Sequence, residues 1–181
     1  MKLRTGCAKV CGRGMSMFKA LVVLLAMTTA GWAETPLKMT ARPEALIVFS
    51  DDLRMGARIV DKSGDKLVAS LNAPEEITLQ AGFWTDKSIT KRGVKSVRLR
   101  CTARFVMADG SRGKKVLNTI CYKGDLADTA NTWTLMKVGL RFRPVVTDPA
   151  GVMGVELTVT DELSGTTGVL IPTFDWRGGK K

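Results

Sequence analysis

The 181-residue chain contains no histidine, and this absence excludes several classes of site. Serine–histidine–aspartate and cysteine–histidine systems use an imidazole as the general base. The usual copper, iron and catalytic zinc sites also hold their metal through imidazole nitrogens. The sequence therefore predicts no metal site and no cofactor, and it favours a protein that is not an enzyme.

Cysteine is scarce outside the first eleven residues, where only Cys101 and Cys121 occur. A zinc site needs about four ligands, and redox-active pairs usually have the spacing Cys-x-x-Cys. We therefore expect Cys101 and Cys121 to form a structural disulfide, with free or intermolecular thiols as the alternative. Cys7 and Cys11 lie in the N-terminal segment that we expect to be removed as a leader, so we expect no metal site at this pair.

The position of these two cysteines also suggests a register. If Val97–Met107 and Val116–Lys123 form a hairpin, its loop is centred near Ser111, which is the midpoint between the cysteines. Cys101 then lies directly opposite Cys121. Directly opposed residues have Cβ atoms roughly 4.5–5.5 Å apart, close to the separation that a disulfide needs.

Long hydrophobic runs are absent too. The longest uncharged apolar segment near the N-terminus, Ala20–Met27, is about eight residues long, whereas a membrane-spanning helix needs roughly twenty. Cations precede this segment, and the small residues Gly31 and Ala33 follow it. This order predicts a secretory signal peptide cleaved near Ala33, whichever of Met1, Met15 or Met17 is the true start. We expect the mature protein to be periplasmic or secreted, where a disulfide persists.

The expected organisation is a signal peptide over residues 1–33, an extended lead-in over 34–44, a single domain over 45–177 and a basic tail over 178–181. The part after the leader is long enough for one domain with its own core. The whole chain has a net charge of +11, but five of its 28 cations and none of its 17 acidic residues lie in the leader. A net charge of +6 remains, which is ordinary for a soluble domain.

Helix-forming patterns are absent from the mature chain, because Gly, Asn, Asp or Pro interrupts every candidate of ten residues. Val97–Met107 instead alternates between apolar and polar residues, which predicts a half-buried strand. The other expected strands are Ala45–Ser50, Ala57–Val60, Leu67–Leu71, Ile77–Ala81, Met136–Phe142, Val155–Val159 and Val169–Trp176. The sequence therefore predicts an all-β fold, an antiparallel β-sandwich.

Three local features refine this expectation. Ala57–Val60 and Leu67–Leu71 should form a hairpin across a turn centred on Gly64. The chain should enter a loop at Gly82. Pro172 cannot donate to a strand ladder, so its segment should lie at an edge or a bulge.

Residues 148–174 contain a corner, a strand, a tight hairpin and a final strand. In this order they resemble the last two strands of immunoglobulin-like domains, which implies a sandwich that is broadly immunoglobulin-like. The corner Tyr of those domains is absent near Met153, and no Cys lies on the penultimate strand. No family is assigned on this resemblance.

Several arginines are candidates for a binding face. Arg98, Arg100 and Arg104 share one side of a predicted strand, and Arg141 and Arg143 share one side of another. If these strands are neighbours, they form a face that attracts an anionic envelope polymer or an acidic protein. The alternative is that the cations cover a solvated surface and protect a sheet edge. Few aromatics separate the cations, so nucleic acid is not an expected partner.

The tryptophans of the mature chain, Trp84, Trp133 and Trp176, have two interpretations. Trp84 beside Phe83 could be a contact pair on a loop, since aromatics anchor interfaces. The favoured interpretation is that such residues close the end of a sandwich. The paired acids Asp51-Asp52, Glu75-Glu76 and Asp161-Glu162 fall in turns or at strand ends, where acidic residues are common.

These observations predict an exported, disulfide-bonded binding or assembly module, whose partner is another envelope protein or an anionic envelope polymer. A small outer-membrane β-barrel protein is the alternative. The sequence does not predict the oligomeric state.

Overall fold

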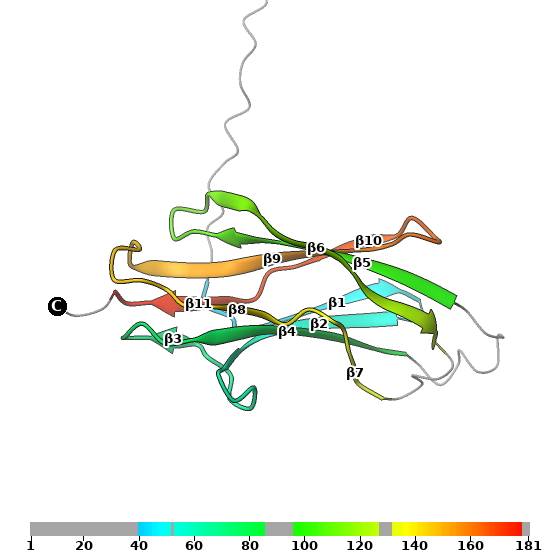
Figure 1. Cartoon of the computed structure of the whole chain (residues 1–181), viewed down its shortest axis with the longest axis horizontal. Coiled ribbons are helices and arrows are strands. Elements are labelled where there is room, and N and C mark those ends of the chain that lie inside the picture. The colour runs from blue at the N-terminus through cyan, green and yellow to red at the C-terminus, as the bar shows by residue number, and fades with distance from the viewer. Residues whose placement is uncertain (1–39, 52, 86–95, 127–131, 179–181) are drawn as a thin grey trace, which may run out of the picture. The chain divides into compact units, whose positions relative to one another are not determined.

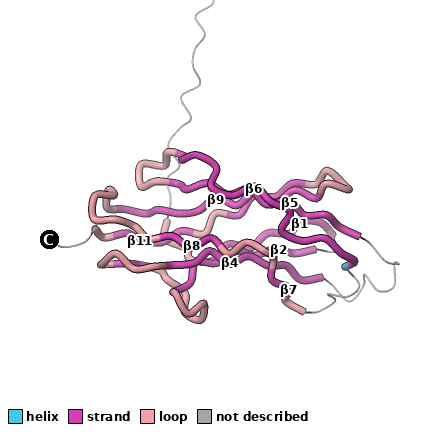
Figure 2. Tube along the Cα trace, in the orientation of Figure 1, coloured by secondary structure: helices cyan, strands magenta, loops and turns pink. Residues whose placement is uncertain are grey.

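The computed structural model of the chain describes residues 40–51, 53–85, 96–126 and 132–178. The expected signal peptide, residues 34–39 of the lead-in and residues 179–181 of the tail lie outside these ranges. The described part consists almost entirely of strands and loops (Figure 2), arranged as two sheets in two layers (Figure 1). This confirms the all-β sandwich. None of the described residues forms a helix that is long and apolar enough to cross a membrane.

The first sheet, called sheet A, is antiparallel throughout. Its strands, in spatial order, are β1 (Glu44–Ser50), β2 (Leu53–Asp61) and β4 (Ile77–Thr85), followed by β7 (Thr134–Leu135) and β8 (Leu140–Phe142), which both pair with β4. The predicted strands Ala45–Ser50, Ala57–Val60 and Ile77–Ala81 are confirmed, and each extends further than expected.

The second sheet, called sheet B, has β9 at its centre. Its strands, in spatial order, are β3 (Ser70–Leu71), β11 (Thr173–Trp176), β9 (Gly151–Asp161), β5 (Ser96–Val106) and β6 (Arg112–Asp125), and β10 (Thr167–Leu170) also pairs with β9. The two-residue pairing of β3 with β11 is parallel. The relation to immunoglobulin-like domains stays a prediction.

The core lies between the two sheets because each long strand turns alternate side chains inward. In β5, Val97, Leu99, Cys101 and Ala103 are buried while the intervening arginines face outward. A second cluster around Trp176 fills one end of the sandwich. The Trp176 indole Nε1 donates to the carbonyl of Asp148 at 3.2 Å, so the polar atom of this buried ring has an acceptor. Trp176 therefore closes the end of the sandwich as expected.

The expected hairpin between Ala57–Val60 and Leu67–Leu71 is wrong in its second half. Only the bridge between Val60 and Leu67 forms. The chain then crosses to sheet B as β3, where Leu71 is buried in the cluster around Trp176. Pairing of Leu71 with Trp176 in sheet B, and its burial there, replace the ladder with β2 that the local pattern suggested. The turn itself forms, with Gly64 at a φ of 88° and the Asp61 carboxylate accepting from the Gly64 amide.

Two further boundaries differ from the expectation. The chain does not leave the sheet at Gly82, because β4 continues to Thr85 with Phe83 buried. Met136–Phe142 is not one strand, because residues 136–139 interrupt the pairing between β7 and β8 and shift the register along β4. Pro172 separates β10 from β11, which both pair with β9 in one common register.

Candidate functional site

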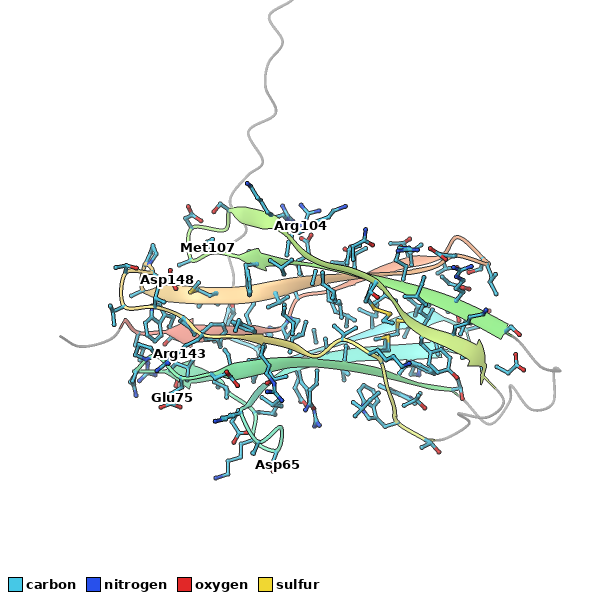
Figure 3. The ribbon with its side chains drawn as sticks, in the orientation of Figure 1. Asp65, Glu75, Arg104, Met107, Arg143 and Asp148 are labelled. Atoms are coloured by element: carbon cyan, nitrogen blue, oxygen red, sulfur yellow. A yellow bond between two sulfur atoms is a disulfide. The ribbon has the colours of Figure 1, made fainter. Side chains whose placement is uncertain are left out.

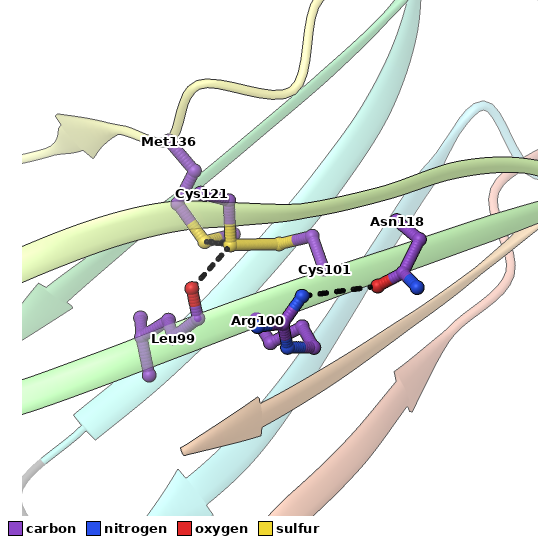
Figure 4. Close-up of a disulfide and its surroundings, with 6 residues drawn as sticks. All are labelled: Leu99, Arg100, Cys101, Asn118, Cys121 and Met136. Carbon is purple, nitrogen blue, oxygen red and sulfur yellow. Dashed lines mark hydrogen bonds between the residues drawn. A yellow bond between two sulfur atoms is a disulfide. The ribbon is translucent and has the colours of Figure 1, made fainter. Parts of the chain in front are cut away.

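Cys101 and Cys121 form the predicted disulfide, with their Cα atoms 5.6 Å apart. Both residues are buried in the main core cluster, so the bond links β5 to β6 from the inner side of sheet B (Figure 4). A buried structural bond has no access to a substrate. This position agrees with a structural role for the pair.

The predicted register of this disulfide is wrong. Cys101 pairs with Thr119, and Cys121 is the extra residue of a β-bulge between the Leu99 and Arg100 pairings. The hairpin loop is centred on Asp109 instead of Ser111, because β5 and β6 already pair at Val106 and Arg112. Three bulges then each add one residue to β6 and bring Cys121 within reach of Cys101. The predicted register assumed an uninterrupted ladder and therefore did not include these inserted residues.

Met136 covers the disulfide from sheet A. Its Sδ lies 3.7 Å from the Sγ of Cys121 and 4.0 Å from that of Cys101. The next residue joins the two layers directly, since the Lys137 amide donates to the Cys121 carbonyl at 2.8 Å. The segment between β7 and β8 therefore closes this side of the sandwich over the disulfide.

The five candidate arginines do not share one face. Arg98, Arg100 and Arg104 lie on β5 in sheet B, whereas Arg141 lies on β8 in sheet A. The Arg143 Nε donates to the carbonyl of Pro74 at 2.8 Å, and Figure 3 places Arg143 beside Glu75 and away from Arg104. The condition that the two strands are neighbours is therefore not met.

The arginines of β5 are paired with glutamates on the same side of sheet B. Glu162 forms ion pairs with Arg98 at 2.8 Å and with Arg100 at 2.5 Å. Glu156 on β9 forms ion pairs with Arg104 at 3.2 Å and with Arg112 at 2.6 Å. This arrangement compensates much of the positive charge that an anionic partner needs.

Asp161 fixes the end of this same sheet. Its Oδ1 accepts from the amides of Arg98 and Leu163, both at 3.1 Å, and its Oδ2 accepts from the Ser164 hydroxyl at 2.7 Å. Burial is the largest single influence and raises the pKa of Asp161, but the hydrogen bonds to its carboxylate together outweigh it. The pKa of Asp161 is therefore lower than its ordinary value. A charged Asp161 holds the β9–β10 turn against β5.

The outer side of sheet A is apolar along one row that crosses the sheet. In this row Leu46 pairs with Gly56, Gly56 with Gly82, and Gly82 with Leu135. Leu46 is 67% exposed and Leu135 is 57% exposed. Val48 lies in the adjacent row on the same side and is 64% exposed. A side of a sheet that faces water is normally polar, so these exposed side chains need an explanation.

Trp133 lies over the two glycines of this row. A Cβ atom on Gly82 would come within 2.5 Å of the Trp133 indole, and one on Gly56 within 2.9 Å. The second indole, that of Trp84, lies beside it with ring centroids 5.4 Å apart. Trp84 neither lies on a loop nor closes the end of the sandwich, because it lies on β4 and points outward; its role as a contact residue stays a prediction. The glycines provide the space that brings the Trp133 ring against the sheet.

We name the side chains of Leu46, Val48, Trp84, Trp133 and Leu135 the sheet-A face. A hollow of about 220 Å³ lies at its margin, lined by Glu44, Leu46, Gly56, Ala57, Arg58 and Trp133. The face therefore combines exposed aliphatic groups and two indoles with charged groups, since Glu44 and Arg58 line the hollow and Arg54 lies between Val48 and Trp84. This is the composition of many protein-binding sites.

Sequence reasoning missed this face, although two signals were present. Leu46 and Val48 lie in the run Ala45–Phe49, where apolar residues occupy both sides of the strand. A glycine inside a strand often marks a close approach by another group, and Gly56 and Gly82 are such residues. Their alignment across β2 and β4 depends on the register between strands, which the sequence does not reveal.

The described residues contain no group of three or more acidic or cysteine side chains that could hold a metal ion. In comparisons with known proteins, no family model matches the chain and no curated protein shows significant similarity to it.

Proposed function

We propose that this protein is an exported, disulfide-bonded β-sandwich that acts as a protein-binding or assembly module of the cell envelope. Its partner binds to the sheet-A face. The observation that carries the proposal is the row from Leu46 to Leu135, which exposes large apolar side chains over Gly56 and Gly82 on the outer side of a sheet. Contiguous apolar surface of this kind commonly marks an interaction site.

The contrast between the two outer surfaces supports this assignment. On sheet B, Glu156 and Glu162 compensate the arginines of β5 and β6. On sheet A, the exposed side chains of Leu46, Val48 and Leu135 contribute no polar group that water could solvate. A protein partner that covers them removes apolar area from water, which is favourable by roughly 25 cal/mol per Å².

Export is supported by the predicted leader and by a disulfide that an oxidising compartment preserves. Cell fractionation tests this part of the proposal. The protein should occur in the envelope or the medium, with an N-terminus near Glu34 and with both late cysteines protected from alkylation. Recovery from the cytosol with the leader uncleaved and both thiols reactive would contradict export.

Binding is tested by capture from envelope extracts with a Leu135→Lys variant. Leu135 is 57% exposed, so the substitution places a charge in the sheet-A face at little cost to the fold. Leu163→Lys is the matched control, since Leu163 is 62% exposed in the β9–β10 turn. Partners retained by the wild type and by Leu163→Lys should be lost with Leu135→Lys. Recovery of the same proteins with all three forms, or of none, would contradict binding through this face.

A further inference from the structure

Strand β1 is an open edge of sheet A. It pairs with β2 along one side, and no described strand pairs with its other side. Its charged residue is Glu44 at the start, and residues 45–50 contain neither a charge nor a proline. Exposed edges of this kind readily add another strand, and proteins usually protect them.

The other edges of the described sheets carry such protection. Strand β6 has three bulges and is cationic, with Arg112, Lys114, Lys115 and Lys123 along it. Strands β7 and β8 are two and three residues long, and the Lys137 bond to β6 covers the segment between them. On the remaining side of sheet B, β3 and β10 are also short. Protection of these kinds is thus present at these edges and lacking along β1, where β10 contacts the inward side chains Ile47 and Phe49 through Gly168 without pairing.

The peptide groups of β1 are oriented for pairing at this edge. The Ile59 amide donates to the Pro43 carbonyl at 2.8 Å. Because residues alternate along an antiparallel ladder, the peptide groups of Ala45 and Ile47 then point toward β2. Those of Glu44, Leu46 and Val48 point toward the open edge. The side chains of the same three residues lie on the outer side of sheet A.

We propose that the occupant of this edge is a second copy of the chain, paired antiparallel to β1 about a two-fold axis at Leu46. The ladder between β1 and β2 is regular from Glu44 to Val48 and is interrupted by a bulge at Phe49. Leu46 is the centre of that regular segment. A two-fold axis at Leu46 therefore uses the whole regular part of the strand and sets Leu46 opposite Leu46 of the second copy.

The side chains complement each other in this register. Leu46 of each copy, which has the highest exposed fraction among the large apolar side chains of the described residues, packs against its counterpart. Glu44 faces Val48 of the second copy, and Arg54 lies beside that Val48 on β2. Two strand spacings, about 10 Å, separate Glu44 from Arg54 of the second copy, a distance that their extended side chains span. Within the part of the chain that the structure describes, neither residue has an ion-pair partner.

The two-fold axis makes two such Glu44–Arg54 pairs and closes the assembly at two chains, because each copy has one β1 edge. The row from Leu46 to Leu135 then continues from one copy into the other. This inference rests on the proposed function in that the dimer presents two sheet-A faces as one surface. The buried area of a single strand pair is small, so the association should be weak and concentration-dependent.

Sedimentation equilibrium of the full exported protein from about 1 to 200 µM tests the dimer, since this range brackets weak association. The mass should rise with concentration from one chain to two and stop there. Leu46→Lys should weaken association at least tenfold, because it sets two like charges opposite each other. Val116→Lys, on the edge strand β6 at the other end of sheet B, is the matched control, since Val116 is also an exposed apolar residue, and it should dimerise like the wild type. A single-chain mass at every concentration, growth beyond two chains, or full association of Leu46→Lys would overturn the proposal.

Crosslinking tests the register separately. Leu46→Cys should form an intermolecular disulfide under mild oxidation, because directly opposed residues have Cα atoms about 5.5 Å apart, within the range of a disulfide. Val48→Cys should not, since the two Val48 positions are offset by four residues along the strands. Equal crosslinking of the two variants would overturn the register.

These results are separable from those on the proposed function. Leu135 lies away from the β1 edge, so Leu135→Lys should lose captured partners and still dimerise. A wild type that stays monomeric while Leu135→Lys loses its partners would overturn the dimer alone. A wild type that dimerises but captures no partner would contradict the proposed function and would still support pairing through β1.

Discussion

The backbone amide of Lys137 donates to the carbonyl of Cys121 at 2.8 Å, and this bond joins the edge of sheet A to the edge of sheet B. Cys121 can accept it because it is the extra residue of a bulge, where the ladder to β5 is interrupted. The same bulge places its Sγ against Cys101 and Met136. One inserted residue therefore serves the disulfide and the contact between layers.

Loss of the disulfide should destabilise the protein markedly. Cys101→Ala combined with Cys121→Ala opens a loop of twenty residues, and the chain-entropy model predicts a cost of about 3 kcal/mol. The melting temperature should fall by roughly 10 °C for a domain of this size. Thermal unfolding followed by circular dichroism measures the change. Added reductant should lower the melting temperature of the wild type and leave that of the double variant unchanged; an insensitive wild type contradicts the structural role.

Substitution of Gly82 should disturb the sheet-A face. In Gly82→Ala the new Cβ would lie 2.5 Å from the Trp133 ring and 2.7 Å from the backbone oxygen of Thr134. Because the backbone cannot yield easily, we expect a loss of about 1–3 kcal/mol in the free energy of unfolding, together with a red shift of tryptophan fluorescence as Trp133 moves into water.

Gly139→Ala is the matched control for this change. No atom lies within 4 Å of a Cβ placed there, so its stability should stay within about 0.5 kcal/mol of the wild type. Chemical denaturation of both variants gives the comparison. Equal stabilities for Gly82→Ala and Gly139→Ala would show that Trp133 does not pack on Gly82.

The strands of this fold could be predicted because their signal is local. Val97–Met107 alternates without interruption, and β5 follows it closely. Pairings between distant segments could not be predicted in the same way. Leu67–Leu71 continues a plausible hairpin with β2 of sheet A, yet Leu71 lies in sheet B, where it pairs with Trp176 and is buried beside it. The disulfide was predictable from composition and the expected compartment, whereas the bulges that bring the two cysteines together are a property of the β5–β6 register.

For the candidate sites too, local features could be predicted from the sequence, and the pairings between distant strands could not. The alternation of β5 correctly places Arg98, Arg100 and Arg104 on one side of the sheet. That Glu162 and Glu156 lie next to them follows from the β5–β9 register, which no short segment encodes. The sheet-A face depends on Gly56 aligning with Gly82, again a property of the register between strands.

Removal of Glu162 should expose positive charge on sheet B. Glu162→Gln leaves Arg98 and Arg100 without the carboxylate that both contact. The variant should elute from immobilised heparin at a higher salt concentration than the wild type, because the arginines become available to an anion. Asp65→Asn is the control with the same change in net charge, at an exposed acidic residue of the turn after β2 that forms no ion pair within the described residues. An equal shift for the two variants would mean that net charge alone determines retention.

Acid should weaken the fold through Asp161. Hydrogen bonds from Arg98, Leu163 and Ser164 hold the pKa of this carboxyl below its ordinary value, despite the opposing effect of burial. A group with a lowered pKa in the folded state stabilises the fold fully above its unfolded pKa of about 3.9, and the contribution is lost as the pH falls through the folded value.

Asp161→Asn should therefore be less stable than the wild type at pH 7 by at least about 1 kcal/mol. The difference should shrink as the pH falls below about 4, because protonation then weakens the same hydrogen bonds in the wild type. Urea denaturation of both proteins between pH 2 and pH 7 measures this difference, and a gap that stays constant across the range would contradict a charged Asp161 as the anchor of the β9–β10 turn.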